Sequence, residues 1–210
     1  MKWVQVKQGD CIASIADQHG FFWEQLWNHQ QNSDLKEKRK NPNVLLPGDK
    51  VFIPDLDPFI VSCPTGQAHK FVVKGVPEEL NLQMKIDGLP VKNTDYVLEI
   101  DDQEIAGTTD GEGRIVQSIM PSTKSARVVL GEGEDRLEYN LDLGHLDPID
   151  EVSGVQARLD NLGFGLGKTD GELGQNTAAA LKSFQEAHDL DPSGELDQAT
   201  KDALLKEHES

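Results

Sequence analysis

The residue types that could perform covalent chemistry are few and scattered in this sequence. Its 210 residues include two cysteines and six histidines. Cys63 and His69 form the most enzyme-like pair, because a cysteine nucleophile needs a nearby base and an electropositive setting. No third orienting residue and no catalytic signature surrounds the pair. We therefore interpret Cys63 as an ordinary thiol and expect no cysteine nucleophile.

Acidic residues and histidines also give no convincing active site. Hydrolysis of a glycan needs two carboxylates about 5–10 Å apart, but 37 acidic residues make such pairs uninformative. We interpret Asp170 and Glu172 as parts of a structural loop. A zinc site needs ligands at characteristic spacing, and the nearest cluster, His145 with Asp147 and Asp150, lies in an acidic linker. We expect no enzymatic activity, no metal and no cofactor.

Charge and apolar patterning exclude further classes of function. The formal net charge is −17, which argues against binding to nucleic acid or to anionic lipid, because both require clustered Lys and Arg. No apolar run approaches the roughly 18 residues of a membrane helix. The first ten residues, MKWVQVKQGD, contain no apolar signal region. We expect a cytoplasmic protein at synthesis, and any export would require a separate machine.

Two Pro- and Gly-rich breaks, at 47–58 and 144–154, divide the chain into three modules. We expect domains at 1–54, 55–147 and 148–210, and the net charge changes from +1 to −10 and −8 across them. Such a shift favours separate modules. The predicted fold class is multidomain α+β: βααβ, then an antiparallel β-sandwich, then three helices. The sequence shows no obvious repeated unit.

The first module has the order strand, helix, helix, strand. Its pattern predicts a strand over 3–7, a helix on which Ile12, Ile15 and Ala16 share one face, and a closing strand over 51–53. A second helix is predicted over Phe22 and Leu26, and it could extend through Leu35. We expect the two strands to pair, because neither is stable alone. Trp23 and Trp27 could form a sugar platform, although core packing or protein docking is the commoner role of such pairs. The basic run 36–40 is a solvated helix end or a surface for an acidic partner.

This module resembles a LysM domain over residues 3–54. The resemblance rests on Val6-Lys7-Gln8-Gly9-Asp10, on Ser14-Ile15-Ala16, and on Leu46-Pro47-Gly48-Asp49-Lys50-Val51-Phe52-Ile53-Pro54. It implies binding of N-acetylglucosamine-containing glycans, with backbone amides gripping acetamido groups and small apolar side chains taking the methyl. The implied groove residues are Gly9, Asp10, Cys11, Ile12, Val44, Leu45, Leu46 and Pro47.

The sequence departs from the LysM pattern in two places. Cys11 stands where the family usually has Thr or Ser, and the stretch 30–41 is longer than usual. A LysM-shaped module without sugar binding therefore stays open as an alternative.

The middle module shows short strand patterns separated by turn signals. The expected strands are 70–74, 80–86, 96–101, 114–119, 126–130 and 137–141. Leu80, Leu82, Met84 and Ile86 alternate as in a half-buried strand. The turn 107–113, Gly-Thr-Thr-Asp-Gly-Glu-Gly, resembles those of Ig-like or transthyretin-like domains in bacterial surface and injection proteins.

The last module reads as three helices with a distinct motif. One helix carries Val155, Leu159 and Leu162 and ends at Gly163; the second spans 177–190; the third begins after Asp197. Residues 151–205 resemble the three-helix peptidoglycan-binding domain found beside cell-wall lytic enzymes. The motif residues that could serve binding are Asp170, Gly171, Gly174, Thr177, Phe184 and Gln185.

Together these features predict a non-catalytic peptidoglycan-binding protein. Two weak modules on one chain can bind a repeating polymer roughly 10²–10⁴-fold more tightly than one. The combination of modules resembles accessory proteins of type VI secretion or phage-like contractile injection systems, which could carry the protein to the periplasm or a target cell. The alternative is an adaptor or chaperone that grips spike, baseplate or effector proteins. A cell-wall hydrolase with an unrecognised site is the third alternative.

Overall fold

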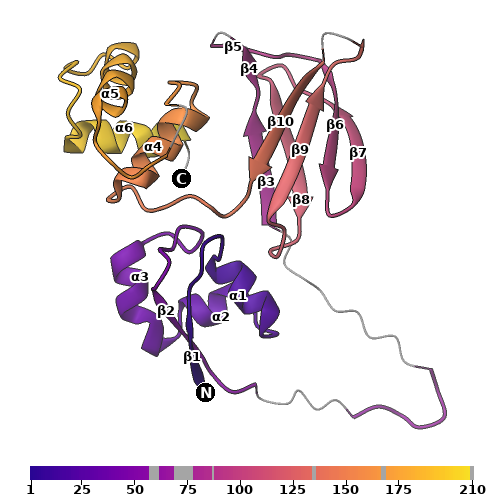
Figure 1. The fold of residues 1–210 in the computed structure, drawn as a ribbon. Coiled ribbons are helices and arrows are strands. Elements are labelled where there is room, and N and C mark those ends of the chain that lie inside the picture. The colour runs from indigo at the N-terminus through magenta and orange to yellow at the C-terminus, as the bar shows by residue number, and fades with distance from the viewer. Residues whose placement is uncertain (57–61, 69–77, 87, 134–135, 167–168, 209–210) are drawn as a thin grey trace.

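The computed structural model describes residues 1–56, 62–68, 78–86, 88–133, 136–166 and 169–208. Its buried hydrophobic residues form three separate clusters, which lie in the N-terminal, middle and C-terminal parts of the chain. Figure 1 shows the corresponding three modules, with strands concentrated in the middle one and helices in the last. The expected strand Lys70–Lys74 lies outside the described residues.

The N-terminal module pairs its first and last segments. Strand β1 (Lys2–Gln5) runs antiparallel to β2 (Lys50–Ile53), with Lys2 opposite Ile53. Between them lie α1 (Ile12–Gln18), α2 (Trp23–Trp27), a 3₁₀ turn η1 (Gln30–Asn32) and α3 (Ser33–Arg39). The second helix is therefore confirmed as α2, but its extension through Leu35 as one helix was wrong, because η1 and α3 are separate elements.

Asn32 explains why that helix is divided. His29 is extended (φ −68°, ψ 135°), which ends the helical path. The buried Asn32 side chain then donates to the Phe52 carbonyl (3.0 Å) and accepts from the Phe52 amide (2.7 Å). An amide side chain can satisfy both backbone groups of a strand residue. Asn32 thus makes the two hydrogen bonds to Phe52 that a neighbouring strand would otherwise make on this side of β2.

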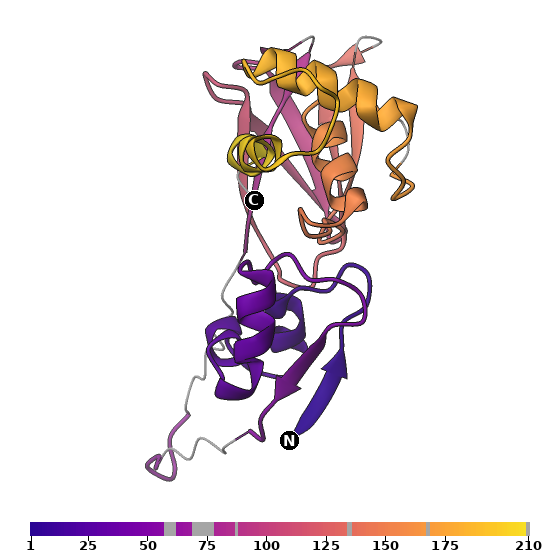
Figure 2. The ribbon, with the colours of Figure 1, turned by 90° about the vertical axis from the view of Figure 1, so that its left-hand side faces the viewer.

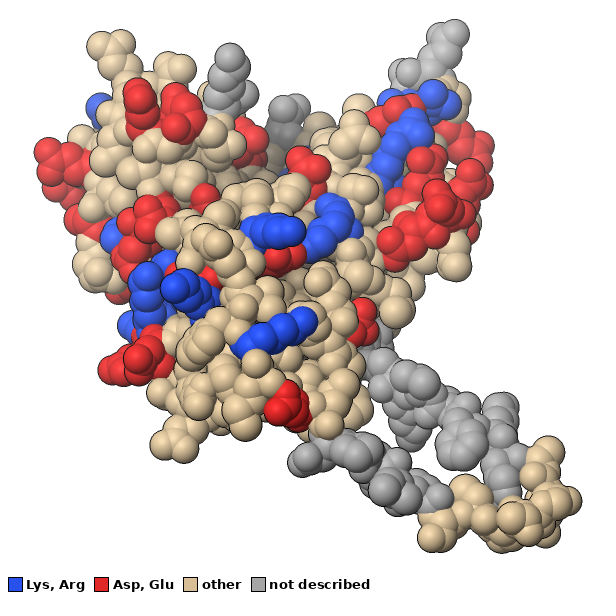
Figure 3. All heavy atoms as spheres, turned by 60° about the horizontal axis from the view of Figure 1, so that its bottom comes forward, with Lys and Arg blue, Asp and Glu red and all other residues tan. Residues whose placement is uncertain are grey.

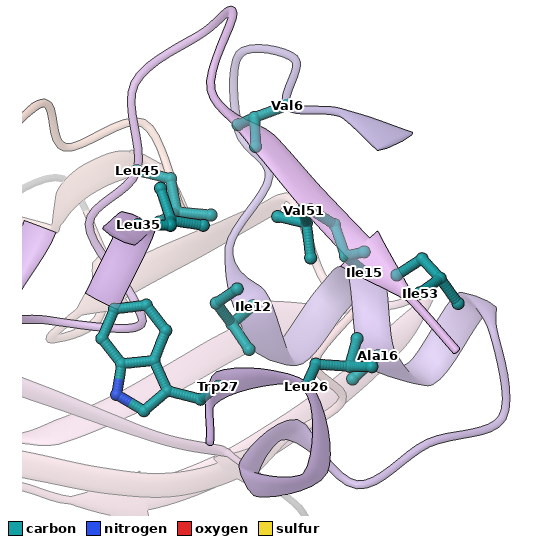
Figure 4. Packing of buried hydrophobic residues seen from close by; sticks show 10 residues of the cluster. All are labelled: Val6, Ile12, Ile15, Ala16, Leu26, Trp27, Leu35, Leu45, Val51 and Ile53. Carbon is teal, nitrogen blue, oxygen red and sulfur yellow. The ribbon is translucent and has the colours of Figure 1, made fainter. Parts of the chain in front are cut away.

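The core of this module is built from the helices and β2 (Figure 4). Ile12 and Leu26 are fully buried, and Trp27 is only 5% exposed. Trp23 packs against the same cluster. The structure therefore places Trp23 and Trp27 in core packing and not in a sugar platform.

Two sheets share the core of the middle module. One has the order β10-β9-β6-β7 and the other pairs β3 with β8; a short β4–β5 pair completes the described part of the module. The strands are β3 (Glu78–Gln83), β4 (Lys85–Ile86), β5 (Leu89–Pro90), β6 (Asp95–Ile100), β7 (Gln103–Thr108), β8 (Arg114–Ile119), β9 (Ser125–Leu130) and β10 (Leu137–Asp142). The expected strand 80–86 is split after Gln83, and Ile86 is exposed.

The C-terminal module has the three expected helices, α4 (Val152–Asn161), α5 (Gln175–Ala187) and α6 (Gln198–His208). Leu159, Leu181, Phe184 and Leu204 are fully buried between them, while Leu162 is partly buried. Gly163 has φ +87° directly after the end of α4, as expected of a residue that terminates a helix. None of the described helices is long and apolar enough to cross a bilayer.

Candidate functional site

A buried glutamine holds the first loop of the C-terminal module. Gln156 on α4 is 1% exposed. Its Oε1 accepts from the Gly171 amide at 2.8 Å, and its Nε2 lies within 3.0 Å of Asp170 Oδ1, the Glu172 carbonyl and Thr177 Oγ1. One side chain thus fixes the loop that leads into α5.

A second buried glutamine holds the second loop in the same way. Gln185 on α5 accepts from the Gly194 amide at 2.8 Å and donates to the Glu195 carbonyl and Thr200 Oγ1, both at 2.9 Å. The two loops share the pattern Gly-Glu-Leu-x-Gln-x-Thr, at 171–177 and 194–200. The expectation of no repeated unit was therefore wrong. The repeat is hard to see in sequence because each glutamine precedes its loop glycine by a different distance, 15 residues in one case and 9 in the other.

These contacts divide the motif residues of the C-terminal module into two sets. Thr177, Phe184 and Gln185 are buried, so their side chains shape the module and do not face a ligand. Asp170, Gly171 and Gly174 are exposed on the first loop. The motif thus fixes a loop and leaves its outer side free for contact.

Leu173 is the residue of this loop that the motif did not single out. It is 60% exposed. Its counterpart in the second loop, Leu196, packs against the helical core. Because the same position is packed in the other copy of the repeat, the exposed Leu173 is a candidate contact residue. The sequence alone does not distinguish the two leucines, since both follow Gly-Glu.

Of the two carboxylates considered for hydrolysis, that of Asp170 has structural partners. Asp170 accepts from Gln156 and from the Glu172 amide (2.9 Å). Glu172 contributes its backbone carbonyl to Gln156 and Thr177. The loop therefore uses Asp170 as a turn-stabilising acceptor.

The expected cluster of His145, Asp147 and Asp150 does not converge. Asp147 accepts from Ser153 at 2.6 Å, and Asp150 forms an ion pair with Lys201 at 2.9 Å. His145 lies instead against the N-terminal module. Within the described residues no group of three His, Cys, Asp or Glu side chains could hold a metal ion.

Arg158 is buried beside this linker, and His208 lies half-buried within range of its charge. Arg158 donates to the Asp147 and Gly154 carbonyls, both at 2.8 Å. Burial lowers the pKa of Arg158 to about 10, although the charge of Asp147 acts in the opposite direction. Burial, together with the charge of Arg158, lowers the pKa of His208. Arg158 thus fixes the linker to α4.

The backbone amides of the groove implied by the LysM resemblance are largely occupied. The amides of Asp10, Cys11 and Ile12 donate to Lys7, Ser14 and Pro42. The Leu46 amide donates to Asp49 Oδ2 at 3.0 Å. These four amides are therefore not free for acetamido groups, contrary to the expectation.

Three of the five apolar side chains expected in that groove belong to the interior. Ile12, Val44 and Leu45 are at most 7% exposed, Leu46 is half-buried and Pro47 is exposed. Cys11 caps α1, because its Sγ accepts from the Ser14 amide at 3.4 Å while Ser14 Oγ accepts from the Cys11 amide. It thus takes the capping role that Ser or Thr commonly has.

Two segments of the middle and linker regions cover the first loop of the groove. Gly9 is buried, and a Cβ atom there would lie 2.8 Å from Nε2 of His145. A Cβ atom at Gly144 would lie 2.8 Å from the Gly9 carbonyl oxygen. Lys124 donates to that same oxygen and pairs with Asp10 at 3.5 Å. We call this contact the Gly9 junction.

Asp49 organises the second loop of the groove. Its carboxylate binds Arg39 through two hydrogen bonds of 2.7 and 2.9 Å, and both side chains are at most 7% exposed. Burial alone would raise the pKa of Asp49, but the hydrogen bonds from Arg39 and Leu46 and the charges of Arg39 and Lys38 lower it overall. The loop is thus tied to α3.

The basic run 36–40 meets acidic residues of the same chain. The hydrogen bond with Asp49 is the main cause of the raised pKa of Arg39, and the charges of Glu151 and Asp150 add to it. Lys201 is the main cause of the lowered pKa of Asp150, and the charge of Lys40 contributes. Figure 3 shows Lys and Arg side chains gathered next to acidic ones at one edge of the molecule. An acidic partner for this run is therefore present within the chain. For the remaining expected pair, Cys63 is exposed, and His69 lies outside the described residues.

Comparison with known proteins bears on the C-terminal module. Residues 149–204 match the family model of the peptidoglycan binding domain. No curated protein and no solved structure matches the chain significantly. The family match covers the three helices and both glutamine-held loops. It supports peptidoglycan as the partner of this part of the chain.

Proposed function

We propose that the protein binds peptidoglycan without cutting it, and that the C-terminal module makes the principal contact. The observation that carries this proposal is the family match over 149–204. The geometry adds support, because Gln156 holds an exposed loop that presents Leu173. The use of Asp170 as a turn acceptor favours binding over hydrolysis.

The route to the wall belongs to the same proposal. The resemblance of the module combination to accessory proteins of contractile injection systems supports delivery by such a machine. A net charge of −17 gives no attraction to an anionic wall, so binding must come from shaped contacts.

The Gly9 junction favours a second candidate function, an adaptor. The loop that a LysM domain would use for sugar is here in contact with protein, through Lys124 and His145. In this alternative a spike, baseplate or effector protein takes the place of Lys124 and His145 at this loop. In this alternative the C-terminal module would anchor the complex.

Co-sedimentation with purified, insoluble sacculi tests the proposal. We expect the full chain to pellet with sacculi and the profile of soluble muropeptides to stay unchanged after incubation. Release of new fragments would contradict the non-catalytic assignment. A chain that stays in the supernatant would contradict peptidoglycan binding and leave the adaptor as the better account.

A further inference from the structure

The outer face of the N-terminal sheet carries an exposed tryptophan. Trp3 on β1 is 55% exposed. Exposing a large aromatic ring to water is costly, because burial of a large apolar side chain is worth about 1.5–3 kcal/mol. Trp is enriched at interfaces, because its ring is apolar while its indole N–H can donate a hydrogen bond.

The Trp3 ring is supported from behind. It contacts Phe52 edge to face at 5.3 Å, and Phe52 also contacts His29 at 4.9 Å. Phe52 is held in turn by the two hydrogen bonds of Asn32 to its backbone. The ring is therefore positioned by a chain of packed groups, which lowers the entropy lost when a ligand stacks on it.

Polar groups border the ring on the same face. Gln5 and Lys50 lie opposite each other in the β1–β2 register, two residues from Trp3 and Phe52, so that all four side chains are on one face of the sheet. Trp3, Val4, Gln5 and Lys50 line a shallow hollow of about 390 Å³. This volume lies at the lower end of the range for small-molecule sites, roughly 300–1,000 Å³.

The hollow also lies at an open edge of the sheet. β1 pairs with β2 on one side, and among the described strands no other pairs with it. Figure 2 shows β1 at the outer edge of the N-terminal module, away from the other two modules. The site is thus accessible while the Gly9 junction is closed.

We propose that this face, formed by Trp3, Gln5 and Lys50, binds the glycan strand of peptidoglycan. A pyranose ring presents a face of C–H groups that packs on an aromatic ring, while its hydroxyl and acetamido oxygens accept from Gln5 and Lys50. The proposal rests on the proposed function and adds a second contact on a different module. It is separate from the loops that the LysM resemblance indicates.

Charge favours this occupant. Lys50 is exposed and forms no ion pair with any residue that the structure describes, so its ammonium group is available to donate to glycan oxygens. The N-terminal segment 1–54 has a net charge of +1 in a chain of −17. This face is therefore among the surfaces least repelled by an anionic wall polymer.

The test uses the full chain and two soluble probes, muramyl disaccharide-peptide fragments and the stem peptide without sugar. The three tryptophan indole N–H resonances are assigned with Trp3→Phe. We expect the Trp3 resonance to shift with the disaccharide-peptide and to stay in place with the peptide alone. A shift with the peptide alone would overturn the glycan assignment in favour of strand addition at β1.

Variants measured with sacculi complete the test. We expect Trp3→Ala and Lys50→Glu each to weaken binding about tenfold, which corresponds to about 1.4 kcal/mol. The controls are Phe22→Ala, another exposed aromatic residue of the module, and Lys92→Glu, the same charge change elsewhere. Trp3→Ala removes the ring that packs on Phe52 and could therefore disturb the fold. Lys50→Glu leaves this packing intact, so a loss of binding in this variant reports on the site itself.

The outcomes separate this proposal from the function on which it rests. If the parent binds sacculi and both variants bind equally well, the sheet-face site is excluded while peptidoglycan binding stands. If the parent does not bind sacculi, the proposed function fails and this site fails with it.

Discussion

At the scale of single residues, two glutamines decide the shape of the C-terminal module. In both Gln156 and Gln185, the side-chain oxygen accepts a hydrogen bond from the amide of a loop glycine. The side-chain nitrogen donates to a loop carbonyl and to a threonine hydroxyl. A buried side chain with both donors and acceptors can satisfy a turn that has no regular structure of its own. The loops are therefore ordered from within.

Replacing Gln185 with Ala should destabilise the C-terminal module by about 2–3 kcal/mol, because buried groups lose their partners. Hydrogen exchange of α5 and α6 amides in the full chain measures this change. Gln175→Ala, at an exposed position on the same helix, should stay within about 0.5 kcal/mol of the parent. Equal effects of the two variants would show that the Gln185 contacts contribute nothing specific.

Asp49 makes the stability of the N-terminal module dependent on pH. Its folded-state pKa lies below the ordinary value of 3.8, so the unfolded chain binds the proton more readily. The stabilisation is present at neutral pH and is lost as the pH falls through that value and below it. Asp49→Asn should be less stable than the parent at pH 7, and the difference should shrink below about pH 4.

Tryptophan fluorescence during urea unfolding checks this expectation, because the three tryptophans of the chain, Trp3, Trp23 and Trp27, are all in the N-terminal module. A stability difference that stays constant from pH 7 to the acid limit would contradict the role of the Arg39–Asp49 pair.

At the scale of elements, the approach of the linker to α4 is closest at Gly154. A Cβ atom there would lie 2.1 Å from the Pro148 carbonyl oxygen and 2.5 Å from that of Asp147. Real Cβ atoms do not come so close to backbone, and the oxygen belongs to a turn that Arg158 also binds. The glycine is required by packing and not by its backbone angles.

Gly154→Ala should therefore destabilise the module by about 2 kcal/mol or more, although alanine is favoured over glycine in helices by about 1 kcal/mol. Thermal unfolding followed by the helical circular dichroism signal measures the loss. Gly174→Ala is the matched control, since a Cβ atom there meets nothing within 4 Å. A stabilised Gly154→Ala would show that the linker can move away.

Patterns along single elements and the pairing of β1 with β2 were readable from sequence, whereas contacts between modules were not. The strand over 114–119 and the end of α4 at Gly163 were confirmed, because alternation and a terminating glycine are local signals. Strand β7 was missed, since Ile105 is its one large apolar residue and it lies at a sheet edge. The covering of Gly9 by residues 115 and more positions away has no local signal at all.

At the scale of the whole molecule, the Gly9 junction holds the N-terminal module against the rest of the chain. It includes the ion pair of Lys124 with Asp10, and the charges of Arg39 and Glu151 add an electrostatic attraction between the modules. Partly exposed ion pairs are weak and are screened by salt. The arrangement is therefore sensitive to ionic strength.

Lys124→Glu should open the junction, because it removes the donor to Gly9 and places a negative charge beside Asp10. We expect a larger radius of gyration in small-angle scattering and faster hydrogen exchange at the Gly9 loop, with the parent approaching this state in high salt. Lys92→Glu supplies the same change of charge away from the junction. Identical scattering profiles for the two variants would contradict the closed arrangement.

The β1–β2 pair also determines how the N-terminal module responds to force. The start of β1 and the end of β2 lie together, with Lys2 opposite Ile53 and the N-terminal amino group paired with Asp55. A load applied across these two ends peels the antiparallel ladder one rung at a time and does not shear it. The module would then unravel at low tension and release about 170 Å of chain, at 3.3–3.6 Å per residue. Unfolding of the N-terminal module at low force would limit the force that reaches the C-terminal module, and would so protect the contact of that module with its ligand.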